Sequence, residues 1–159
     1  MKIVKTFLTR EKLEKIREID CTFYKDVKDI EWYVKRYNRF HYAYMLVEGD
    51  REVGYILSVP IRKQFYDAIR SGVLIGDYDV NPNMFLTESY YNYIVSCVIL
   101  EEYRNKGYGK ALMEALFETG RGLYICITIS NNGYKLANLY MNEILKIDNF
   151  TYLFEKEVD

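Results

Sequence analysis

The chain has 159 residues, half of them apolar, which is enough for one domain with a sizeable core. Its 22 basic and 23 acidic residues are mixed along the chain, so the charge pattern does not indicate a nucleic-acid binder. The apolar runs are far shorter than the roughly 20 residues that a membrane span needs, and the N-terminus does not have the apolar block of a signal peptide. We therefore expect a single cytoplasmic domain over 1–159, without a nucleic-acid or membrane partner.

Residues 1–59 predict three strands and two helices. Each helix begins at a residue whose side chain can cap it, Thr9 for the first and Asp29 for the second, and the second is predicted to cover 29–39. The strands are predicted from alternating runs or from runs of β-branched and aromatic residues. They cover 2–8, 41–47 and 52–59. A short turn with glycine separates the last two, so these should form an antiparallel hairpin.

An irregular insert is expected over about 60–88. Pro60 opens it and a helical segment over 62–70 follows, but the remainder is long and acidic at Asp77 and Asp79. Long connections in compact domains are often functional, so this segment is a candidate lid or wall over a substrate site, with carboxylates that attract a cationic amine. A solvated surface insert is an equally open interpretation.

The rest of the chain predicts alternating strands and helices. Strand 90–100 is apolar and β-branched toward its end, as expected of a strand covered on both faces. After it we predict a helix over 106–118, a strand over 122–129, a helix over 134–141 and a strand over 150–156. Because a helix connects strands 90–100 and 122–129, these two should be parallel.

The turn after strand 90–100 has the pattern Arg-x-x-Gly-x-Gly, formed by Arg104, Gly107 and Gly109. Glycines allow backbone N–H groups to approach a ligand closely, and the N-terminus of the next helix attracts an anion such as a phosphate. Leu112 stands where the dinucleotide fingerprint needs its last glycine, and Ala111 stands where the mononucleotide loop needs serine or threonine. Two interpretations remain, a site for another phosphate ligand and a glycine turn that only starts a helix.

This pattern, preceded by Tyr103 and a strand of the buried type, closely resembles the acetyl-coenzyme A loop of the GNAT superfamily of N-acetyltransferases. The resemblance implies an α/β GNAT acyl-CoA N-acyltransferase fold. In that fold a mixed, mainly antiparallel sheet has two splayed central parallel strands and is flanked by helices. It also implies transfer of an acetyl group from acetyl-coenzyme A to a primary amine by direct attack in a ternary complex, without a metal.

The resemblance assigns cofactor contacts residue by residue. Backbone groups at three positions after the central strand should pair with the thioester and the pantetheine arm, and the glycine loop should bind the pyrophosphate. Asparagine is usual in the family where Gly133 stands, so the neighbouring Asn132 is included. The expected cofactor-binding residues are Ile99, Leu100, Glu101, Arg104, Asn105, Lys106, Gly107, Tyr108, Gly109, Lys110 and Asn132.

Tyr140 is the expected general acid. Leu139-Tyr140 resembles the end of the family's second cofactor motif, and a phenol held close to sulfur can protonate the departing thiolate. The amine must also lose a proton, and Glu88, just before the central strand, is the nearest candidate base, with Asp77 and Asp79 as others. A structural Tyr140 at a helix edge is the alternative.

The remaining reactive residues are not expected to take part. Cys21, Cys97 and Cys126 are widely spaced in apolar surroundings, which favours burial in the core over a metal site or a disulfide. The one histidine, His41, has no partner pattern around it.

A second hypothesis about function is a non-catalytic coenzyme A-binding sensor or regulatory module that keeps the loop and has lost turnover. The acceptor on the enzyme hypothesis is a small molecule or a protein that carries an amine. The sequence contains no motif that distinguishes among them, and it leaves the oligomeric state open, with a homodimer as one option.

Overall fold

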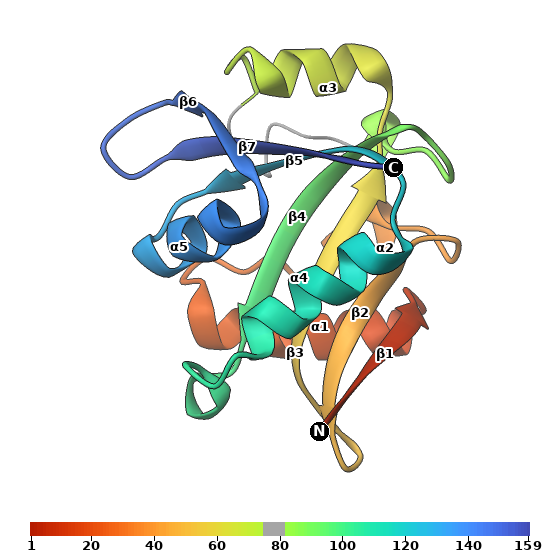
Figure 1. The fold of residues 1–159 in the computed structure, drawn as a ribbon. Coiled ribbons are helices and arrows are strands. Elements are labelled where there is room, and N and C mark those ends of the chain that lie inside the picture. The colour runs from red at the N-terminus through yellow and green to blue at the C-terminus, as the bar shows by residue number, and fades with distance from the viewer. Residues whose placement is uncertain (75–81) are drawn as a thin grey trace. The chain divides into compact units, whose positions relative to one another are not determined.

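The computed structural model describes residues 1–74 and 82–159, so the predicted acidic residues Asp77 and Asp79 lie outside the described residues. Within these ranges the strands form one mixed sheet with the order β1-β2-β3-β4-β5-β7-β6 (Figure 1). The strands are β1 (Lys2–Phe7), β2 (Tyr42–Glu48), β3 (Arg51–Pro60), β4 (Tyr91–Ile99), β5 (Gly122–Thr128), β6 (Asn142–Lys146) and β7 (Tyr152–Val158). The helices are α1 (Arg10–Phe23), α2 (Ile30–Arg36), α3 (Lys63–Arg70), α4 (Tyr108–Thr119) and α5 (Asn131–Tyr140), with 3-10 turns at Pro82–Met84 and Glu101–Tyr103.

The sheet confirms the predicted fold class. Strands β4 and β5 pair in parallel, as expected from the helix that connects them. The pairs β1–β2, β2–β3, β5–β7 and β6–β7 are antiparallel. The parallel pairing ends at Ile94 and Cys126, although β4 continues to Ile99 and β5 to Thr128. The sheet is therefore mixed and mainly antiparallel.

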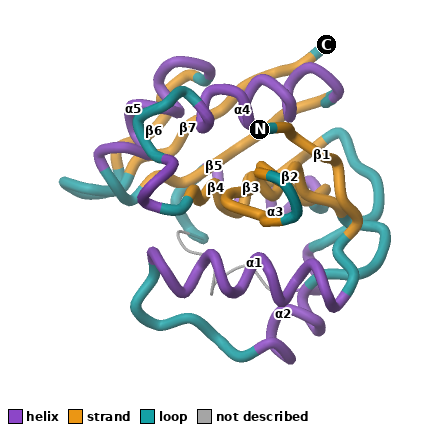
Figure 2. Tube along the Cα trace, turned by 90° about the horizontal axis from the view of Figure 1, so that it is seen from below, coloured by secondary structure: helices purple, strands orange, loops and turns teal. Residues whose placement is uncertain are grey.

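The chain divides into two compact units, one formed by 1–57 with 96–118 and the other by 58–95 with 119–159. In the first unit, α1 and α2 lie on one side of the strands β1 to β3 and α4 lies on the other (Figure 2). Thr9 and Asp29 cap α1 and α2 as predicted, through side chains that accept from Lys12 N and Trp32 N.

Helix α2 is shorter than predicted. It ends at Arg36 and not at 39, because Tyr37 is extended and buried. The chain then turns back, with the Asn38 amide donating to His41 Nδ1 and the Asn38 side chain accepting from the Phe40 amide. His41 is buried and belongs to this turn, in agreement with the absence of a catalytic pattern around it.

In the second unit, α3 lies above and α5 below the strands β5 and β7 in the view of Figure 1. The edge strand β6 was not predicted from the sequence. Its five residues are mostly exposed and show no alternation of apolar residues, and the strand is defined by its pairing with β7. The pairing of β6 with β7 therefore defines this strand, and the local sequence pattern does not encode that pairing.

The cysteine expectation is only partly correct. Cys126 is buried as predicted, whereas Cys97 is half-buried and Cys21 is exposed. The face of α1 that packs against the core carries Leu13, Ile16 and Asp20. Cys21 follows Asp20 and therefore points away from this face.

In the part of the chain that the structure describes, no helix combines the length and apolar character needed to cross a membrane.

Candidate active site

The glycine loop starts where β4 ends, in the first unit. Leu100 is buried, and its amide donates to the Val53 carbonyl of β3 at 2.9 Å. The 3-10 turn follows, with the Arg104 amide donating to the Glu101 carbonyl at 3.1 Å. Of the three predicted thioester and pantetheine contacts, Leu100 thus uses its N–H within the sheet, Ile99 ends β4, and Glu101 is exposed.

Arg104 braces this turn with its side chain. Its Nε donates to the Ile99 carbonyl at 2.8 Å, and its guanidinium carbon lies 5.4 Å from the centre of the Phe23 ring at the end of α1. A guanidinium over an aromatic face gains a cation–π attraction in addition to the hydrogen bond. The arginine of the motif therefore shapes the loop, a role that the spacing pattern did not reveal.

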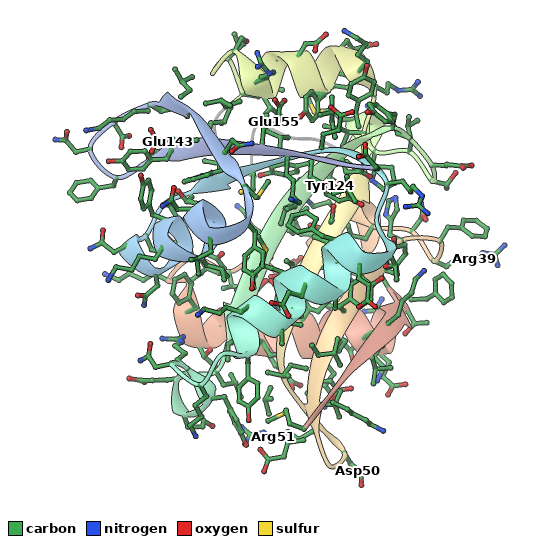
Figure 3. All side chains as sticks on the ribbon, in the orientation of Figure 1. Arg39, Asp50, Arg51, Tyr124, Glu143 and Glu155 are labelled. Atoms are coloured by element: carbon green, nitrogen blue, oxygen red, sulfur yellow. The ribbon has the colours of Figure 1, made fainter. Side chains whose placement is uncertain are left out.

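Two residues that flank the β2–β3 turn, Glu48 and Arg51, contact the 3-10 turn before the glycine loop. Arg51, labelled beside Asp50 in Figure 3, lies 3.6 Å from the Glu102 carboxylate. The Tyr103 hydroxyl donates a hydrogen bond to the Glu48 carboxylate, and this hydrogen bond is the main reason why the pKa of Tyr103 is raised. Both partners of the Arg51 ion pair are exposed, so these contacts orient the loop more than they stabilise it.

Two residues of the loop have a left-handed backbone conformation before α4 begins. Asn105 has φ 60° and Gly107 has φ 86°. A Cβ placed on Gly107 would meet no atom within 4 Å, so the space beside this glycine is open. The Ala111 amide donates to the Gly107 carbonyl at 3.1 Å and opens the helix, which explains why α4 starts at Tyr108 and not at 106 as predicted.

This geometry suits an anion such as a phosphate. An open space lies beside a glycine at the N-terminus of a 12-residue helix, where unpaired N–H groups and the positive dipole end favour an anion. Lys106 and Lys110 are exposed on this segment and add positive charge, and Tyr108 and Gly109 form the first turn of α4. The predicted residues from Arg104 to Lys110 lie on this one continuous segment.

The other predicted residues belong to the second unit. Asn132 is exposed in the first turn of α5, whose cap is Ser130, with Oγ accepting from the Gly133 amide at 3.0 Å. Tyr140 is half-buried at the last position of α5, and Glu88 is exposed before β4. The glycine loop belongs to the first unit, whereas these residues belong to the second. It therefore stays a prediction that they bind and react with the same cofactor as the loop.

A buried polar cluster in the first unit was not predicted from the sequence. The Tyr33 hydroxyl donates to Asp20 Oδ2 at 2.6 Å, and the Tyr55 hydroxyl donates to Asp20 Oδ1. The Tyr55 oxygen also lies 2.6 Å from Ser96 Oγ on β4. Burial, and next the charge of Asp20, raise the pKa of both phenols, so the two tyrosines are neutral donors.

One sequence signal could have revealed this cluster. Asp20 continues the spacing of Leu13 and Ile16 on the apolar face of α1, and a carboxylate on such a face must find hydrogen-bond donors.

In the described ranges, no group of three or more His, Cys, Asp or Glu side chains is placed to hold a metal ion.

Comparison with known proteins gives one family and many related folds. A family model described as the acetyltransferase (GNAT) family matches residues 13–140. No curated protein sequence matches the chain.

Solved structures match over nearly the whole chain. The loading GNATL domain of CurA from Lyngbya majuscula has a TM-score of 0.69 at 12% identity, covering 99% of this chain and 98% of that one. The ribosomal-protein-S18-alanine N-acetyltransferase from Escherichia coli has a TM-score of 0.66 at 10% identity, covering 99% and 95%. Arabidopsis thaliana NAA60 in complex with acetyl-CoA has a TM-score of 0.62 at 15% identity, covering 99% and 100%. At these identities the likeness concerns the fold.

Proposed function

Because the chain belongs to the GNAT acetyltransferase family, we propose that it transfers an acetyl group from acetyl-coenzyme A to a primary amine. The observation that carries this proposal is the loop from Arg104 to Lys110, with its open space at Gly107 and a helix N-terminus beside it. A diphosphate is an anion that suits such a site. Acetyl-coenzyme A supplies a thioester, which an amine can attack directly.

The residues of this chain would act in three ways on that substrate. Backbone N–H groups of the loop hold the diphosphate, and the Ile99 amide polarises the thioester carbonyl. Tyr140 protonates the departing thiolate, since a phenol close to sulfur can donate its proton. Glu88 is the base candidate from the sequence. The bond from carbon to sulfur breaks as the bond from carbon to nitrogen forms.

A calorimetric titration with acetyl-coenzyme A tests the binding step. The wild type should bind with a micromolar Kd, and Gly107→Glu should abolish binding because its carboxylate fills and repels the phosphate site. Gly49→Glu is a matched control. Gly49 also has a positive φ, of 60°, and no atom within 4 Å of a Cβ, but it lies in the β2–β3 turn. No binding by the wild type, or equal losses in both variants, would refute the proposed site.

A Tyr140→Phe variant separates the enzyme from the sensor. If Tyr140 is the acid, thiol release should fall about 100-fold while the Kd for acetyl-coenzyme A stays the same. A sensor would release no thiol in either form. The acceptor panel should contain a peptide with a free N-terminal alanine, a lysine peptide, a polyamine, a free amino acid and an aminoglycoside. The peptide is included because one structural neighbour is named for alanine N-acetylation.

A further inference from the structure

We propose that Ser96, Tyr55 and Asp20 form a proton relay that removes a proton from the acceptor amine, with Ser96 as the residue that contacts the amine. This proposal rests on the proposed acetyl transfer and assigns the base for that reaction. It replaces Glu88, which is exposed before β4, with a group inside the first unit. All three relay residues belong to that unit, as does the glycine loop.

The direction of the hydrogen bonds follows from the donors available. A tyrosine hydroxyl carries one proton, and that of Tyr55 goes to Asp20 Oδ1. The hydroxyl of Ser96, 2.6 Å away, must therefore donate to the Tyr55 oxygen. The chain runs from Ser96 through Tyr55 to a carboxylate. Because hydrogen bonds in such a chain polarise one another, the lone pairs of Ser96 become a good acceptor for a cationic N–H group.

Burial makes Ser96 the accessible end of the chain. Asp20 is 7% exposed and Tyr55 is 1% exposed, whereas Ser96 is only half-buried. Ser96 also lies beyond Ile94, the last β4 residue that pairs with β5. Among these three residues, Ser96 is therefore the one that is not buried.

Ser96 also has a suitable position along β4. It lies three residues before Ile99, the residue whose amide we expect beside the thioester. A strand rises about 3.3 Å per residue, so about 10 Å separate the two backbones. An amine that contacts both the serine oxygen and the thioester carbon, directly or through one water, can span that gap.

The proton transfer is balanced without another reactant. An N–H bond of the ammonium breaks and its proton moves to Ser96 Oγ, the Ser96 proton moves to Tyr55, and the Tyr55 proton moves to Asp20. The net result is one new O–H bond on Asp20 and a free electron pair on nitrogen. Tyr55 and Ser96 act as neutral carriers, in accordance with the strongly raised pKa of Tyr55, which burial causes in the first place.

The test compares two buried phenols on the same carboxylate. Tyr55→Phe and Tyr33→Phe each remove one hydroxyl from Asp20, but only Tyr55 connects to Ser96. With the best amine of the acceptor panel, Tyr55→Phe and Ser96→Ala should each lower kcat by about 100-fold, and Tyr33→Phe by less than about threefold. All three variants should retain the wild-type Kd for acetyl-coenzyme A.

Hydroxylamine serves as the rescue probe, because this acceptor is already neutral at neutral pH and needs no base. With it, Tyr55→Phe and Ser96→Ala should reach within about threefold of the wild-type rate, which a merely structural defect would not allow. A Tyr33→Phe rate within about tenfold of the Tyr55→Phe rate, or no rescue by hydroxylamine, would overturn the relay. If Tyr55→Phe does not fold, Ser96→Ala and its rescue decide alone. If the wild type releases no thiol with any acceptor, the proposed function itself fails.

Discussion

Two tyrosine-bound carboxylates, Asp20 in the first unit and Glu155 in the second, are built differently. Asp20 is 7% exposed and accepts from two neutral phenols. The Glu155 side chain is 18% exposed, and its Oε2 accepts from the Tyr66 hydroxyl at 2.5 Å and from Arg70 Nε at 3.1 Å. Figure 3 labels Glu155 on β7, where these contacts join α3 to the sheet. Burying a charge is expensive, so Asp20 needs both phenols, whereas Glu155 retains water and a cation.

The two carboxylates differ in what their contacts do. The contacts of Glu155 join two elements, whereas Asp20 is the carboxylate that the proposed proton relay uses. An ion pair with a half-exposed arginine can form at many surfaces and costs little to build. A desolvated carboxylate that contacts a strand through a chain of hydroxyls costs stability, and such groups gather at functional sites. Substitutions at three carboxylate sites sharpen this contrast.

The largest effect should come from Asp20→Ala. The change leaves the Tyr33 and Tyr55 hydroxyls buried without their acceptor, so the free energy of unfolding should fall by about 3 kcal/mol. Urea unfolding of the variant and the wild type measures this. Asp20→Asn keeps one acceptor oxygen and should lose clearly less. A loss under about 1 kcal/mol for Asp20→Ala would show that the phenols find other partners.

A smaller effect is expected for Glu155→Ala. Tyr66 loses its acceptor, but water can replace it at this partly exposed site, so the loss should be about 1 to 2 kcal/mol. Arg70→Ala is the matched change on the other partner and should cost under about 0.5 kcal/mol, because the arginine side chain is half-exposed. Thermal unfolding of both variants checks the order. Equal losses would mean that the ion pair, and not the phenol, holds α3.

The smallest effect concerns a third carboxylate, Glu52, which accepts a hydrogen bond from the Lys12 ammonium group. Burial tends to raise the pKa of Glu52, but the hydrogen bond from Lys12 at 2.7 Å and its charge outweigh this, so the pKa is lowered on folding. A lowered carboxylate pKa adds stability above the unfolded pKa near 4.5, and this stability is lost as pH falls through the folded value.

Lys12→Met should therefore flatten the acid side of the stability curve by less than about 1 kcal/mol. Urea midpoints at pH 7 and at pH 3 measure the difference. Between these two values the wild type should lose more stability than the variant. An identical loss in both proteins would remove Glu52 from the acid response.

The amino-acid sequence by itself determined the elements that depend on local pattern. The caps Thr9 and Asp29, the hairpin of β2 and β3, and the order of strand, glycine turn and helix around Arg104 follow from spacing and backbone preference, which act within a few residues. The same stretch identified the family. The resemblance also supplied every predicted loop residue, because a glycine turn that leads into a helix is encoded by consecutive positions.

Only the tertiary structure decided which distant residues meet. Strand β6 exists through its pairing with β7, and Arg104 turns back to the Ile99 carbonyl and the Phe23 ring. The cluster of Asp20, Tyr55 and Ser96 joins a helix and two strands that are far apart in the chain. Such contacts are chosen by packing and by the need to satisfy buried polar groups, and these conditions exist only once the chain has folded.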